Sequence, residues 1–227
     1  RDLHSFPTRR SSDLAIISAM EREAVKKLFG KNFIGKDELK PFFKASGFGE
    51  VDIHEKPIEY SDSDLQKAAK EGYILISGVE HVEGQNISLR FLRDKFGVNP
   101  DVSEPCLYNQ DWYLKEEFMD RFLNNQWFLI KKEVFEESRA VMPGDLTQQG
   151  LNFPPAILCG YTFFAYFFAN KEYLWWHDFV WCCDTDHNGD RIYVGKYHDI
   201  DGVNKNGVSI HRHLALRPCY GSVNLMK

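Results

Sequence analysis

Apolar and polar residues in the first half of the chain recur mostly at the spacing of short amphipathic helices. This spacing predicts helices over 20–30, over 35–47 with a bend or early end at Pro41, after Ser61 and after Ser88. Both serines stand where an N-cap accepts a backbone N–H, and Gly72 and Gly97 stand where the two helices should end. The first half is therefore expected to be helix-rich.

Other runs in this half follow different patterns. The β-branched run 73–79 and the run 126–135 predict strands, and 109–125 predicts a helix from about Leu114. At helical spacing beside Lys115, the acidic residues Glu116, Glu117 and Asp120 are interpreted as a solvated face rather than paired catalytic acids. The segment 143–150, "PGDLTQQG", is interpreted as a linker between the two halves.

Residues 153–169, "FPPAILCGYTFFAYFFA", carry no charge and are apolar on all sides. A membrane-spanning helix is the alternative, but it needs about 20 predominantly apolar residues, and this run contains Tyr161, Thr162, Tyr166 and two prolines. We therefore expect a helix buried at the centre of the domain, and no contact with a membrane.

The last third contains three strand-like runs separated by "DTDHNGD" and "DIDGVNKNG". Both separators contain Asn-Gly, a strong signal for a tight hairpin turn, so a three-stranded antiparallel meander is predicted. If each Asn-Gly pair forms a two-residue loop, Phe179 lies opposite His198, His177 opposite Ile200, and Ile200 opposite His213. A wide second loop or a bulge would change this register.

With that register, one face of the meander forms the core and the other collects aromatic and ionisable side chains. The predicted core face carries Leu174, Trp176, Val180, Cys182, Tyr193, Tyr197, Val208, Ile210, Leu214 and Leu216. The other carries Trp175, His177, Phe179, Trp181, Lys196, His198, Ile200, His211 and His213. Imidazoles of His177, His198 and His213 would form a zinc-type site, with His211 or Asp199 as substitute ligand. The simpler interpretation is a set of solvated histidines.

The first separator offers a second metal hypothesis. Asp184, Asp186, Asn188 and Gly189 fit the first, third, fifth and sixth positions of a calcium loop, with Asp190 at the seventh. Gly195 stands where the loop should end in glutamate, and strands rather than helices flank the loop, so an acidic hairpin turn is the alternative.

Composition narrows the class of protein further. The net charge of −5 at pH 7 without a basic block makes nucleic acid a poor partner. Five cysteines without CxxC spacing favour reduced thiols and a cytoplasmic location. Read back into codons, residues 1–14 fit one frame of a widely used sequencing adapter, so we expect them to be a translated artefact that replaces the natural start.

These patterns predict an α+β fold with a helix-rich N-terminal half, a buried aromatic central helix and a C-terminal antiparallel β-meander. Residues 15–142 form the first region, and 151–227 form a helix-plus-meander unit packed on it. The function that requires fewest coincidences is a non-catalytic module whose face, with Trp175, Phe179 and Trp181, binds a small molecule or protein partner. A small zinc-type enzyme and a purely structural protein are the alternatives.

Overall fold

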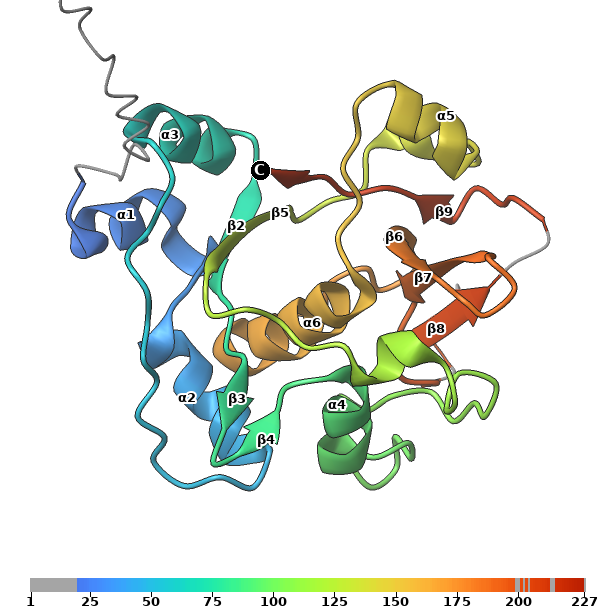
Figure 1. Cartoon of the computed structure of the whole chain (residues 1–227), viewed down its shortest axis with the longest axis horizontal. Helices are drawn as coiled ribbons and strands as arrows, with labels where there is room; N and C mark the ends of the chain where they lie inside the picture. Colours follow the sequence, from blue (N-terminus) through green and yellow to red (C-terminus); the bar gives the residue numbers. More distant parts are fainter. Residues whose placement is uncertain (1–19, 199–200, 202, 204, 213–214, 227) are drawn as a thin grey trace, which may run out of the picture.

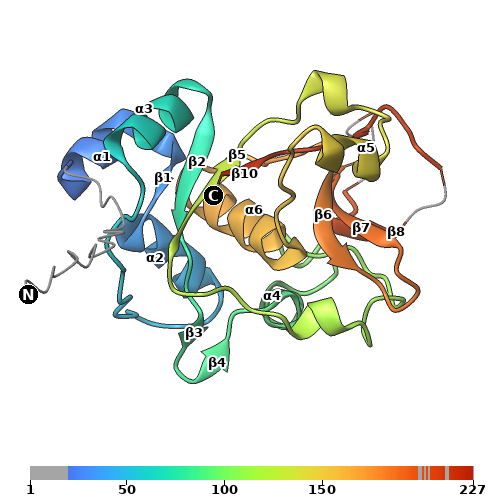
Figure 2. The same cartoon turned by 45° about the horizontal axis from the view of Figure 1, so that its top comes forward.

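A computed structural model describes residues 20–226 apart from 199–200, 202, 204 and 213–214. Two four-stranded sheets stand on either side of one long central helix, α6 (Ala156–Asn170) (Figures 1 and 2). This arrangement confirms the predicted α+β class with its aromatic helix at the centre. The expected artefact, residues 1–14, lies outside the described residues.

The first sheet has the strand order β1-β2-β5-β10. Its strands are β1 (Phe33–Ile34), β2 (Tyr73–Ser77), β5 (Trp127–Lys131) and β10 (Leu225–Met226). β1 runs parallel to β2, whereas β5 is antiparallel to both β2 and β10. The C-terminal strand thus completes a sheet whose other strands all belong to the first half.

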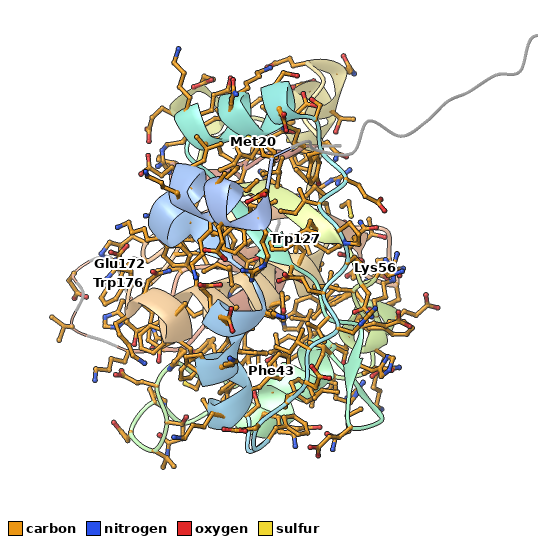
Figure 3. The ribbon with its side chains drawn as sticks, turned by 90° about the vertical axis from the view of Figure 1, so that its left-hand side faces the viewer. Met20, Phe43, Lys56, Trp127, Glu172 and Trp176 are labelled. Carbon is orange, nitrogen blue, oxygen red and sulfur yellow. The ribbon has the colours of Figure 1, made fainter. Side chains whose placement is uncertain are left out.

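Side chains along β2 alternate in direction, so the sheet has apolar side chains on both faces, and helices cover both. α1 (Arg22–Phe29) and α3 (Asp62–Lys70) pack on the outer face around Tyr73 and Leu75. Ile74 and Ile76 face inward to the main core, which includes residues of α2 (Lys36–Ala45), α4 (Leu89–Phe96) and α6. Trp127 donates from Nε1 to the carbonyl oxygen of Lys56 at 2.8 Å, which holds the 48–60 segment against β5 (Figure 3).

The predicted N-caps are confirmed. Ser61 Oγ accepts from the N–H of Asp64, and Ser88 Oγ accepts from the N–H of Phe91, both at 3.1 Å. Between α3 and α4 lies a short hairpin of β3 (His81–Val82) and β4 (Gln85–Asn86). Its two-residue turn, Glu83-Gly84, has positive φ at both positions.

The second sheet contains the predicted meander and has the order β8-β7-β6-β9. β6 (Phe179–Thr185), β7 (Arg191–Gly195) and β8 (Ser209–Arg212) are antiparallel neighbours, and β9 (Tyr220–Gly221) adds a parallel strand beside β6. Val180, Cys182 and Val194 face the main core with α6. The opposite face carries Phe179, Trp181, Tyr193 and Tyr220, which pack against Leu146 and Phe153.

Helix α6 is enclosed by protein along most of its length. Phe163 and Phe164 are fully buried, and Phe168 is partly buried against the same core. Tyr161, also buried, donates from its hydroxyl to the carbonyl oxygen of Ser77 in β2 at 2.9 Å. Among the helices of the described residues, none combines the length and the apolarity that crossing a bilayer requires.

Two local predictions are wrong. The segment 109–125 forms only a short 3-10 helix over Glu117–Asp120, because its groups make contacts elsewhere in the fold. Arg90 donates to the Leu114 carbonyl at 3.0 Å, and Trp112 Nε1 donates to the Ile210 carbonyl at 3.2 Å. The expected linker instead contains helix α5 (Pro143–Gln148), whose Leu146 is buried against the second sheet. Pro143 suits the first turn of such a helix.

Candidate functional site

The turn between β6 and β7 is built around one carboxylate. Oδ1 of Asp186 accepts hydrogen bonds from the backbone N–H groups of Asn188 and Asp190, both at 2.9 Å, and Gly189 has a φ of 84°. The Asp186 side chain thus accepts hydrogen bonds from two backbone N–H groups of the turn, an arrangement that differs from the backbone pairing of a two-residue loop. Five residues, 186–190, connect the strands.

This turn, together with a bulge, overturns the predicted register. Phe179 pairs with Gly195 rather than His198, Trp181 pairs with Tyr193, and the register shifts between Trp181 and Thr185. The longer turn and the bulge change which residues are opposite one another, and Tyr193 therefore joins the face of Phe179 and Trp181. The second connection is wide, as the alternative interpretation allowed: Gly195 already pairs with Ser209.

Glu116 reaches this turn from a distant part of the sequence. Its Oε2 accepts from the backbone N–H of His187 at 2.9 Å, and its Oε1 lies 2.6 Å from His187 Nδ1. Glu116 is buried, whereas the His187 side chain is 65% exposed. A buried carboxylate therefore orients an imidazole whose outer edge faces solvent. The prediction that Glu116 belongs to a solvated face is wrong.

Arg212 at the end of β8 supplies the positive charge of the site. Its Nη1 donates to Asp186 Oδ2 at 2.8 Å, and its guanidinium lies over the Trp112 ring at 5.1 Å from the centroid. Burial disfavours the ionised carboxylate of Asp186, but the hydrogen bonds from Arg212 and from the N–H groups of Asp190 and Asn188 outweigh it. The pKa of Asp186 is therefore held below its usual range.

Asp184, the first residue of the predicted calcium loop, has another role. Its Oδ1 accepts from Arg121 Nη1, and its Oδ2 accepts from the backbone N–H of Ala156 at 2.6 Å, at the N-terminus of α6. Asp186 accepts from backbone N–H groups of Asn188 and Asp190. Asp184 thus caps helix α6 from strand β6, and the other residues of the calcium hypothesis form a turn stabilised by the Asp186 side chain.

The histidines of the predicted zinc site have different environments. His177 lies in a bend before β6 and is half-buried, and its Nδ1 has no hydrogen-bond partner among the described residues. His198 is buried and stacks on Trp176 with ring centroids 4.0 Å apart. His213 lies outside the described residues, so the predicted cluster stays a prediction.

His211, the substitute ligand, packs between aromatic rings of the second sheet. Its ring centroid lies 5.5 Å from that of Phe179 and 5.8 Å from that of Tyr193. Its Nε2 lies 3.1 Å from Nε2 of Gln110, whose amide donates to the imidazole when Nδ1 carries the ring proton. Burial, with a smaller effect of Lys196, lowers the pKa of His211, so the ring is neutral at pH 7.

The proposed aromatic wall is buried. Trp175, Phe179 and Trp181 are 6%, 6% and 1% exposed. Trp175 packs into the main core and donates from Nε1 to the carbonyl oxygen of Lys132 at 3.0 Å. Phe179 and Trp181 are covered by Leu146 of α5 and by Phe153. Trp176, predicted to face the core, is half-buried at the molecular edge that Figure 3 shows beside Glu172.

Three side chains at the β6–β7 turn lie as close together as the ligands of one metal ion. One ligand atom each from Glu116, Asp186 and His187 lies within 4.8 Å of the other two, and within the described ranges no other three His, Cys, Asp or Glu side chains meet this condition. Helical spacing could not identify Glu116, because the segment forms only the 3-10 helix Glu117–Asp120, and the burial of Tyr113, Glu116 and Met119 is seen only in the structure.

The chain was compared with models of protein families, with curated proteins and with solved structures, and nothing matches in any of the three.

Proposed function

We propose that the protein is a binding module for a divalent metal ion of the zinc class, held at the β6–β7 turn by Glu116, Asp186 and His187. The observation that carries this proposal is the convergence of the three ligand atoms within 4.8 Å. Two of the ligands are buried carboxylates fixed by backbone contacts, and the third is an exposed imidazole. A preformed and partly open site of this kind leaves one position for solvent or a further ligand.

The ligand types favour zinc over calcium. Calcium takes six to eight oxygen ligands, whereas an imidazole nitrogen beside carboxylates suits zinc and its first-row neighbours. Asp184, which would be the first oxygen ligand of a calcium loop, already accepts from Arg121 and from the N-terminus of α6. The ligand atoms that remain for a metal are few, and one of them is an imidazole nitrogen.

Each carboxylate keeps a lone pair for a metal. Among the described residues, Asp186 Oδ2 accepts only from Arg212 and Glu116 Oε2 only from the His187 N–H, while each carboxylate oxygen can accept two hydrogen bonds. Glu116 Oε1 lies 2.6 Å from His187 Nδ1, so the two atoms form a hydrogen bond when Nδ1 carries the ring hydrogen. A metal at Nδ1 would take the place of this ring hydrogen, which the other ring nitrogen, Nε2, can carry instead.

The test is a calorimetric titration of the full chain with ZnCl₂, and with CaCl₂ and MgCl₂ for comparison. Repeating the zinc titration in two buffers of different ionisation enthalpy counts any protons that binding releases. We expect one zinc per chain, with calcium and magnesium much weaker. Co²⁺ in place of zinc adds a visible absorption spectrum that reports the coordination geometry.

Variants assign the ligands. His187→Ala and Glu116→Gln should each weaken zinc binding more than about tenfold, the lower end of what outer-shell partners contribute in other metal sites. His54→Ala is the matched control, because His54 is also an exposed histidine and is not part of the site. His187→Ala should leave the fold intact because its side chain is mostly exposed.

Two outcomes would reject the proposal. If His187→Ala and Glu116→Gln bind zinc as the wild type does, the cluster is a structural ion-pair network only. If His177→Ala and His213→Ala abolish binding instead, zinc occupies the three-histidine site expected from the sequence.

A further inference from the structure

A cavity of about 300 Å³ lies between the β3–β4 hairpin and the loop that joins α2 to α3. Figures 1 and 2 show this loop passing beside the hairpin. Residues 50–54 form one wall, and His81, Val82 and Glu83 of the hairpin form another. The volume is at the small end of the range for small-molecule sites.

Local structure places polar groups at the rim and apolar groups below. Along 50–54 the side chains alternate: Glu50, Asp52 and His54 are exposed, whereas Ile53 between them is 7% exposed and belongs to the main core. Val79 and Val82, 6% and 3% exposed, complete the apolar floor. Asn125 fixes the start of the hairpin by accepting from the Glu80 N–H at 2.9 Å.

The cavity is lined by acidic side chains and by no basic lysine or arginine. Glu50, Asp52 and Glu83 contribute three carboxylates. Within the described ranges, none of these three carboxylates forms an ion pair or a side-chain hydrogen bond. Asp37, by contrast, forms an ion pair with Lys40 at 2.8 Å. The lining therefore carries net negative charge over an apolar floor, and Lys40, outside the cavity, offsets it only in part through its electrostatic interaction with Glu50.

The spacing of the acidic groups favours an extended cation over a metal ion. No three ligand atoms from Glu50, Asp52, His54, His81 and Glu83 lie within 4.8 Å of one another, so a single ion cannot contact three of them at coordination distance. A ligand with two ammonium groups joined by methylene groups fits both the separated carboxylates and the apolar floor. Its charges reach different carboxylates, and its stem covers Ile53, Val79 and Val82.

We propose that this cavity binds a linear aliphatic diamine or polyamine. The ammonium groups pair with Glu50, Asp52 and Glu83 at the rim, and the methylene stem lies on the apolar floor. The site is separate from the metal ligands Glu116, Asp186 and His187, and it requires no metal.

The test is calorimetric titration of the full chain with 1,4-diaminobutane and with spermidine, each at low and at moderate ionic strength. Butylamine, which has the same stem and one ammonium group, is the ligand control, and MgCl₂ is the charge control. We expect the diamine and spermidine to bind at least about tenfold more tightly than butylamine, with affinity falling as salt increases.

The variant Glu50→Gln/Asp52→Asn removes two rim charges from exposed positions and should weaken diamine binding at least about tenfold without loss of folding. Glu137→Gln, an exposed carboxylate outside the cavity, should bind as the wild type does. His187→Ala should also bind the diamine normally, which separates this proposal from that of the metal site.

The proposal is overturned if butylamine or Mg²⁺ binds as tightly as the diamine, because general charge attraction then suffices. Equal weakening by Glu137→Gln and by the double variant, or no binding of either amine by the folded wild type, would overturn it too.

Discussion

Asp184 joins three parts of the chain through one carboxylate. It accepts from Arg121 and from the Ala156 N–H at the start of α6, and its side chain is 1% exposed. We expect Asp184→Asn to lower the free energy of unfolding by about 1–3 kcal/mol, because it removes a charge-assisted hydrogen bond and weakens a helix cap. Urea denaturation followed by circular dichroism measures this.

Asp120→Asn provides the matched comparison, since Asp120 pairs with Arg90 at a position where its side chain is 62% exposed. Its cost should be no more than about 1 kcal/mol. Equal effects of the two changes would show that the buried position of Asp184 confers no extra stability.

The lowered pKa of Asp186 predicts a pH dependence with a definite sign. A carboxyl group whose pKa is lower in the folded state than in the unfolded state stabilises the fold above its unfolded value of about 3.9, and loses that contribution as the pH falls through the folded value. The stability difference between wild type and Asp186→Asn should thus be complete at pH 7 and shrink below about pH 4. A difference that stays constant in urea titrations down to about pH 3 would contradict this.

At the scale of elements, α6 offers a graded test of packing. Phe164 is fully buried and stacks on Phe96 of α4 with centroids 4.4 Å apart, whereas Phe168 is only partly buried. Phe164→Ala should lower the free energy of unfolding by about 3–5 kcal/mol, and Phe168→Ala by clearly less. Thermal and urea unfolding of the two variants, compared with wild type, decide the order, and a reversed order would show that α6 packs differently.

The elements themselves were largely predictable because their signals are local. Serine caps and terminal glycines marked the helices after Ser61 and Ser88, and the uncharged run 153–169 marked the central helix. The register of the meander was not predictable in the same way. It depends on Asp186 accepting from two backbone N–H groups and on a bulge in β6, and Asn-Gly spacing reports neither.

The candidate site was predictable only in part for a related reason. The acidic turn was recognised from its own residues, but its partners Glu116 and Arg212 come from segments far away in the sequence. Neighbouring charges made Glu116 resemble a solvated residue, although Tyr113 and Met119, three residues away on either side, are buried as it is. Glu116 is buried because of contacts between segments that are far apart in the sequence.

At the scale of the whole molecule, the final strands connect the two sheets. β9 pairs with β6 in the second sheet and β10 pairs with β5 in the first, while the main core contains residues from both halves. Deleting residues 220–227 should therefore destabilise both sheets together and leave one cooperative transition. Hydrogen exchange followed by mass spectrometry, on peptides that cover β2 and β6–β7, measures each sheet separately.

A shorter deletion, of residues 225–227, removes β10 and leaves β9, so it serves as the comparison. If the sheets act as one unit, exchange should accelerate in both even after this shorter deletion. Faster exchange confined to β2 and β5 would show instead that the two sheets unfold independently.

The same strands bear on how the protein forms during its synthesis. A ribosome makes the chain from the N-terminus, so the helices and inner strands emerge well before residues 220–226. Until then, β6 lacks its parallel neighbour and β5 exposes an unpaired edge, and open edges of this kind are templates for association with other chains. The growing polypeptide thus passes through a stage at which chaperone protection of two sheet edges should matter most.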